Sequence, residues 1–225
     1  MEKMMDLKIY GQGNSGGGKF KNVIIKGKGQ IMGNIDCNKF KVYGECEMEG
    51  ELKTELADIK GQSKFKGDLK AETAKIQGEI QLNGSLFADE AVITGNIKTD
   101  GDCNAEIFKL EGGFIIDGLL NADMLEIDFY WPCKAREIGG SEIKIKKESK
   151  ISFLGLKNII MPGESNKWLD VDIIEGDDIY LENTVAKVVR GNKIELGRGC
   201  EIQLVEYADE FINDKGSEVK NQKKI

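Results

Sequence analysis

Apolar residues between Gly27 and Ile127 recur in a fixed pattern that repeats every seventeen residues. Each unit starts at a glycine, has a second glycine six residues later, and carries apolar side chains at the second, fourth, eighth, tenth, thirteenth and fifteenth positions after the first glycine. The positions between them are mostly polar or charged. Pairs of apolar residues at i and i+2 are typical of short strands, whereas a helical period of 3.6 residues would not produce this grouping. The first glycines are Gly27, Gly44, Gly61, Gly78, Gly95 and Gly112, and the second are Gly33, Gly50, Gly67, Gly84, Gly101 and Gly118.

Equivalent positions of the units form columns of similar residues. One column is Ile35, Leu52, Leu69, Leu86, Cys103 and Leu120; another is Val42, Ile59, Ile76, Ile93, Leu110 and Ile127; a third, of small residues, is Cys37, Thr54, Ala71, Ala88, Ala105 and Ala122. The inward positions that are not apolar are Gly29, Thr54, Ser63 and Thr99. Three short strands per unit, joined at corners, predict one triangular coil of a parallel β-solenoid, with each strand pairing to its equivalent seventeen residues away. We therefore expect an all-β fold.

The pattern divides the chain into four regions. We predict an N-terminal arm at 1–15, a β-helix of 17-residue repeats at 16–127, a second, smaller β-rich region at 128–208 and a charged mobile tail at 209–225. Trp131 and Pro132 interrupt the register and mark the boundary. The second region contains a basic and apolar loop near 144–168.

Composition excludes several classes of function. The 225 residues include no histidine, which removes Ser/His/Asp and Cys/His nucleophiles and histidine-containing zinc sites. A net charge of -7 argues against a nucleic-acid partner. The five cysteines have no CxxC spacing and are expected to be reduced core residues of a cytoplasmic protein. GNSGGGK at Gly13–Lys19 lacks the GK[ST] of a phosphate loop and precedes a β coil, so we expect no nucleotide and no other cofactor.

Acidic residues follow the small-residue column and form a ladder of one residue per coil. Its members are Asn38, Glu55, Glu72, Asp89, Glu106 and Asp123, which are all acidic except Asn38. Such a ladder could bind cations or a basic partner, but we favour an exposed, solubilising corner whose side chains splay apart. Carboxylate pairs also serve polysaccharide-cleaving solenoids, but no pair here is set apart as an acid and a base.

A basic stretch adjoins apolar residues between Lys134 and Lys157. It could contact an anionic membrane surface or a partner, or be a loop that packs its apolar side on the β core. The candidate contact residues are Lys144, Lys146, Lys147, Lys150, Phe153 and Leu154.

The two ends of a solenoid present unpaired strand edges and an open apolar core unless they are capped. No amphipathic helix precedes the first coil. End-to-end stacking would pair these edges, and the candidate self-association residues are Phe20, Val23 and Ile25 at one end and Ile202, Leu204, Tyr207 and Phe211 at the other.

The 17-residue unit, the preceding GGGKFKNVIIKG and the later EIGGSEI and IEGDDIYLENTVAKVVRGN resemble the bactofilins, in particular their longer spore-former-type members. The resemblance spans roughly Gly16 to Tyr207. It implies a right-handed parallel β-helix that self-assembles into cytoplasmic, nucleotide-independent filaments, often near the inner face of the membrane. It also implies a role in cell shape, envelope synthesis, polar organisation or motility, with proteins of those machineries as partners. Two features depart from the family: the chain has only 2 Pro, and its second β region is sizeable.

The expected function is a non-catalytic, self-assembling scaffold whose main partner is itself. The alternative is a monomeric binding module for a protein or glycan. A hexapeptide-repeat acyltransferase is a third β-solenoid class, but it needs a strict six-residue period and usually a catalytic histidine, which this chain lacks.

Overall fold

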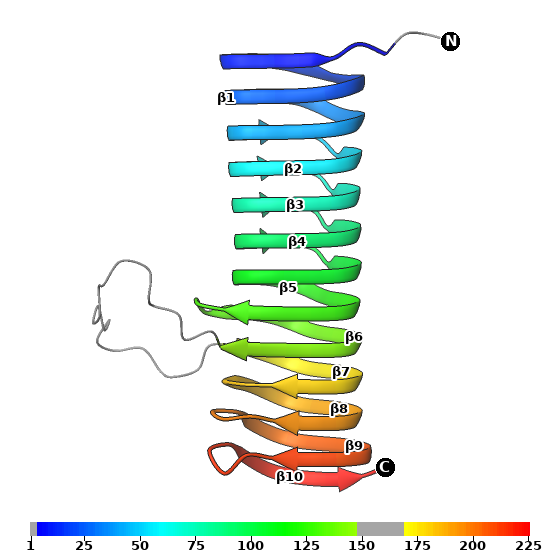
Figure 1. The fold of residues 1–225 in the computed structure, drawn as a ribbon, viewed down its shortest axis with the longest axis vertical. Coiled ribbons are helices and arrows are strands. Elements are labelled where there is room, and N and C mark those ends of the chain that lie inside the picture. Colours follow the sequence, from blue (N-terminus) through cyan, green and yellow to red (C-terminus); the bar gives the residue numbers. More distant parts are fainter. Residues whose placement is uncertain (1–3, 148–168) are drawn as a thin grey trace, which may run out of the picture.

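The chain winds into a rod of stacked β coils, with the two termini at opposite ends (Figure 1). The structure is a computed structural model that describes residues 4–147 and 169–225. The strands are β1 (Leu7–Met48), β2 (Leu52–Phe65), β3 (Leu69–Leu82), β4 (Leu86–Thr99), β5 (Cys103–Phe129), β6 (Cys133–Lys147), β7 (Leu169–Leu181), β8 (Thr184–Leu196), β9 (Glu201–Asn213) and β10 (Glu218–Lys224). They form one sheet in chain order, and every neighbouring pair is parallel.

The register of the sheet confirms the predicted columns. Leu52 lies opposite Leu69, and Leu69 lies opposite Leu86, one coil further along the rod. Each strand bends around corners, so one labelled element covers more than one side of the coil. Backbone hydrogen bonds between coils continue at the corners; for example, Leu52 N donates to Asp68 O at 2.9 Å. Stacking in register explains why equivalent positions carry similar side chains.

The core runs along the axis of the rod. Phe40, Phe65 and Phe108 are fully buried, and the rings of Phe40 and Phe65 meet edge to face with centroids 5.9 Å apart. Thr54, Ser63 and Thr99 are buried among the apolar side chains, as their positions in the repeat predicted. The same core continues through the later strands, in which Ile145, Leu181 and Val189 are fully buried. A single line of apolar side chains therefore joins both halves of the chain.

The first glycine of each unit sits at a corner where the backbone strongly favours glycine. Gly44, Gly61 and Gly78 have φ of 129°, 126° and 129°, in the region that L side chains rarely adopt. A Cβ added at Gly78 would also meet the carbonyl oxygen of Gly61 in the coil before it, far inside van der Waals contact. Close approach of successive coils and positive φ together explain why the column contains only glycine.

The second β-rich region continues the first as part of the same sheet. Its coil between β7 and β8 is fifteen residues long instead of seventeen, since Gly176 pairs with Gly191. Two corners have each lost one residue. Three residues separate Phe65 from Leu69, but only two separate the equivalent Val171 from Ile174. Three residues separate Ile59 from Ser63, but only Glu182 and Asn183 separate Leu181 from Thr184. Asn183 takes the positive φ, 48°, at this shortened corner. The predicted division near residue 128 thus marks a change in coil length within one sheet.

The structure differs from expectation at both ends of the chain. We expected an arm at 1–15 and a charged mobile tail at 209–225. Strand β1 already begins at Leu7, and Lys21 N donates to Met5 O at 2.9 Å, so the arm is part of the first coil. Strand β10 pairs with β9, with Val219 opposite Ile202. Each of these segments lies next to the end coil of the rod. Its backbone pairs with that coil, and its side chains partly cover the apolar residues there.

Candidate self-association ends and lateral groove

At the N-terminal end, the predicted contact residues lie deeper than expected. Val23 and Ile25 are completely buried, whereas Phe20 is half-buried. Leu7 and Ile9 lie sixteen residues before Val23 and Ile25, the same separation as the hydrogen-bonded pair Asp6 and Asn22. The first turn of β1 therefore covers Val23 and Ile25. The side chains nearest the N-terminal end of the core are therefore Leu7, Ile9 and Phe20.

At the C-terminal end, strand β10 covers part of the predicted set. Ile202 is buried beneath Val219, its partner in β10, and Leu204 is half-buried. Tyr207 and Phe211 are half-buried, and their rings pack with centroids 5.5 Å apart. The residues that pair with Val205 and Tyr207 in the last strand are polar: Gln222 and Lys224. The C-terminal end is thus more polar than the N-terminal one.

Sequence reasoning missed Leu7, Ile9 and Val219 as residues of the end coils. The signal was present, because Leu7 and Ile9 repeat the spacing of Val23 and Ile25, and Val219 follows Ile202 by seventeen residues. This spacing was not recognised because these residues lie in short, charged stretches of sequence.

The lysines predicted for membrane or partner contact are partly engaged within the chain. Lys144 Nζ lies 3.5 Å from Glu126 Oε1, and Lys146 Nζ lies 5.2 Å from the centre of the Tyr180 ring. Burial lowers the pKa of Lys147. Lys150, Phe153 and Leu154 fall outside the described residues. Among the residues that are described, no helix is long and apolar enough to cross a membrane.

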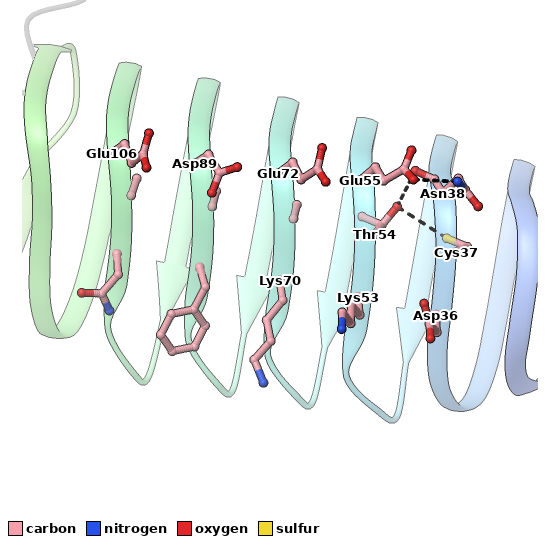
Figure 2. Close-up of a pocket in the computed structure, with 15 residues that line it drawn as sticks. Asp36, Cys37, Asn38, Lys53, Thr54, Glu55, Lys70, Glu72, Asp89 and Glu106 are labelled. Atoms are coloured by element: carbon pink, nitrogen blue, oxygen red, sulfur yellow. Dashed lines mark hydrogen bonds between the residues drawn. The ribbon is translucent and has the colours of Figure 1, made fainter.

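The small-residue column forms the floor of a groove along the side of the rod (Figure 2). The groove has a volume of about 620 Å³ and crosses five coils. Its floor is the column Cys37, Thr54, Ala71, Ala88 and Ala105. One wall is Asp36, Lys53, Lys70, Phe87 and Asn104, and the other is Asn38, Glu55, Glu72, Asp89 and Glu106. The column was expected to face inward, but Ala71, Ala88 and Ala105 are only half-buried. The corner opens to the surface because its residues are too small to fill it.

Hydrogen bonds at the first two coils hold one end of this groove. Asn38 Nδ2 donates to Glu55 Oε1 at 2.6 Å, and the Thr54 hydroxyl lies 3.0 Å from the carbonyl oxygen of Asn38. The Cys37 thiol lies 3.6 Å from the Thr54 hydroxyl. These contacts satisfy the polar groups of the buried floor at this end.

The same corner is hollowed again in the second half of the rod. Gly140, Gly176 and Gly191 line this second hollow, and their pairing places them in the column that starts at Cys37. Here neighbouring residues within each wall are paired: Arg190 lies 3.2 Å from Glu175 on one wall, and Asn192 Nδ2 donates to Asp177 at 2.9 Å on the other.

The thiols do not supply a nucleophile. All five cysteines are buried and unpaired, as predicted. Burial raises the pKa of Cys46 and of Cys133 to about 12, and it also raises the pKa of Cys37, Cys103 and Cys200. A thiol with a raised pKa is protonated near neutral pH and therefore unreactive. Within residues 4–147 and 169–225, no cluster of three or more potential ligands could hold a metal ion.

Comparison with known proteins places the chain in a family. The chain is 48% identical over 241 aligned residues to the Bacillus subtilis (strain 168) protein YhbF, an alignment that covers 99% of this chain and 98% of the relative. It is 37% identical over 92 residues to YhbE of the same organism, covering 40% of this chain and 36% of YhbE. No solved structure matches the chain. A family model described as "Bactofilin: Polymer-forming cytoskeletal" matches residues 2–87, the part of the rod that contains the first 17-residue coils. Together with the β-solenoid fold and the repeat, these matches show that the chain belongs to the bactofilin family.

Proposed function

We propose that this bactofilin is a non-catalytic scaffold that assembles end to end into filaments without nucleotide. The family is a polymer-forming cytoskeletal one, which supports a structural role. The observation that carries the proposal is that the sheet ends in β1 on one side and β10 on the other, with no described element covering either. Each end strand has backbone groups free to pair with another chain, and end-to-end stacking would satisfy them.

The N-terminal end is the stronger candidate for the contact. Leu7, Ile9 and Phe20 continue the apolar core to that end. At the other end, Gln222 and Lys224 occupy positions that are apolar or small in most other coils. Burial of apolar side chains contributes about 25 cal/mol for each Å² removed from water, so a contact at the N-terminal end is favoured over one at the C-terminal end.

The test is sedimentation and negative-stain electron microscopy of purified protein without added nucleotide. We expect large assemblies from the natural sequence. Leu7→Glu places a charge at the N-terminal end and is expected to shorten or abolish the assemblies, whereas Val219→Glu at the C-terminal end has a smaller effect. Met32→Glu is the matched control, because Met32 is 67% exposed on the side of the rod. Circular dichroism checks that each variant keeps its β structure.

A monomeric binding module is the second candidate. Lysines along an edge strand oppose pairing with another edge, and β10 carries Lys220, Lys223 and Lys224. A sharp monomer at high protein concentration would refute the filament and favour this alternative. Assemblies that Leu7→Glu and Val219→Glu leave unchanged would refute the choice of contact surfaces.

As a cellular role, we place the scaffold in the cytoplasm, with a peripheral position at the inner face of the membrane as one option. There it would organise envelope synthesis, cell shape or motility machinery. The support for this part is family membership alone. Fluorescence microscopy of the tagged protein in cells would test it, and a diffuse signal throughout the cell would contradict it.

A further inference from the structure

The lateral groove carries carboxylates that the rest of the rod does not neutralise. Glu72, Asp89 and Glu106 are exposed on three consecutive coils of one wall (Figure 2). Across the described parts of the chain, no hydrogen bond or ion pair engages these three side chains. At the equivalent corner of the second half, Arg190 forms an ion pair with Glu175, and the uncharged Asn192 donates a hydrogen bond to Asp177. The opposite wall of the groove carries Lys53 and Lys70, and Lys70 pairs with Glu51 and Asp68. The lining still has more acidic residues than lysines, because it contains Asp36, Glu55, Glu72, Asp89 and Glu106.

The arrangement of this charge suits an elongated cation better than a single ion. Consecutive coils lie about 4.8 Å apart, so the carboxylates form a line along the rod. They do not converge on one point, in agreement with the absence of a metal-binding cluster in the described residues. A line of charge is matched by a ligand whose positive groups are also spread along its length.

The shape of the groove indicates what kind of ligand this is. Its floor at the same three coils consists of Ala71, Ala88 and Ala105, which allow another backbone to approach closely. Opposite the carboxylates, Phe87 is 38% exposed, and Lys70 Nζ lies 5.8 Å from the centre of its ring. The five coils span about 19 Å, the length of an extended segment of about six residues.

We propose that this groove binds an extended segment, rich in lysine and arginine, from a partner protein. The acidic wall pairs with the basic side chains, the alanine floor accommodates the backbone of the segment, and the exposed part of Phe87, beside Lys70, packs against the apolar stem of an arginine or a lysine. The groove lies on the side of the rod, so the inference does not depend on end-to-end assembly. Every protomer of a filament would still present it.

A binding assay with a defined peptide tests whether the carboxylates of the groove contribute to binding. The probe is a fluorescein-labelled seven-residue peptide of alternating arginine and alanine, followed by fluorescence anisotropy. The triple variant Glu72→Gln, Asp89→Asn, Glu106→Gln is expected to bind the probe about tenfold more weakly, since each exposed pair contributes modestly. Higher salt is expected to weaken binding to the natural sequence.

The matched control removes the same three charges elsewhere. Glu79, Glu111 and Asp117 are exposed and lie outside the groove. The variant Glu79→Gln, Glu111→Gln, Asp117→Asn should bind the probe within about twofold of the natural sequence, because separated surface charges are largely screened. Equal losses in the two triple variants would mean general attraction to an acidic protein and would overturn the proposal.

A second variant tests the shape without changing charge. Ala71→Leu with Ala105→Leu places larger side chains on the half-buried floor. We expect this double variant to bind the probe about tenfold more weakly while it keeps the melting temperature within a few degrees, since the added groups extend into the groove. Unchanged affinity would show that the peptide does not enter the groove. If the double variant unfolds, the two charge variants alone decide the question.

If the groove variants leave peptide binding unchanged but abolish side-by-side association of rods in sedimentation, the occupant is a second copy and the proposal is wrong.

Discussion

Replacement of one glycine in the column of first glycines should show how much that column contributes to the free energy of unfolding. Gly78 has a φ of 129°, and a Cβ there would meet the carbonyl oxygen of Gly61. Holding a residue other than glycine in such a conformation costs about 1–3 kcal/mol. Relieving the clash requires the two coils to shift, which adds the cost of overpacking, about 1–3 kcal/mol. Gly78→Ala should therefore lower the free energy of unfolding by about 4 kcal/mol, with the two contributions summed.

Thermal unfolding followed by circular dichroism measures this loss. For a chain of this size, about 2–4 °C of melting temperature corresponds to 1 kcal/mol, so Gly78→Ala should melt about 8–16 °C lower. Gly16→Ala is the control, because Gly16 has no positive φ and nothing lies within 4 Å of the added Cβ. It should melt at or slightly above the natural temperature. Both variants are compared at one protein concentration, since assembly itself raises apparent stability. Equal melting temperatures for the two variants would refute our explanation of the glycine column.

Two further predictions concern the core. Ser63 Oγ is buried and has no hydrogen-bond partner among the described residues, so Ser63→Ala should raise the free energy of urea unfolding by about 1 kcal/mol; a decrease would show that the hydroxyl is satisfied. Raised thiol pKa values, about 12 for Cys46 and Cys133, mean that the folded state holds protons that the unfolded state releases above its ordinary pKa. Stability should therefore be fully present below about pH 9 and fall as the pH rises toward 12. The double variant Cys46→Ala, Cys133→Ala should show a shallower fall in urea titrations, and an unchanged pH slope would contradict this cause.

The fold of the first half was open to prediction because a parallel solenoid repeats its own geometry. Leu52, Leu69 and Leu86 stack directly on one another, so the same environment recurs once per coil and selects the same type of side chain. The second half was harder to interpret, since its corners are one residue shorter and Asn183 replaces a glycine as the residue with positive φ.

The candidate sites were less predictable than the fold. Burial of Val23 and Ile25 depends on where the chain begins its first coil, and the single turn of β1 around Leu7 has too few residues to show a period. Likewise, β10 could not be predicted from its own residues, because they are mostly polar and show no apolar pattern. The strand is stabilised by pairing to β9.

The sequence by itself determined the coil: its length, its register and the columns of apolar, glycine and acidic residues along the rod. These are local properties that every turn of a parallel stack repeats. Only the tertiary structure decided that the corner of Ala71, Ala88 and Ala105 is hollow, that the second region extends the same sheet, and which strands close the two ends. The physical reason is that a period records which side chains share an environment, whereas the direction in which a corner opens and the covering of an end depend on how the coils pack in space.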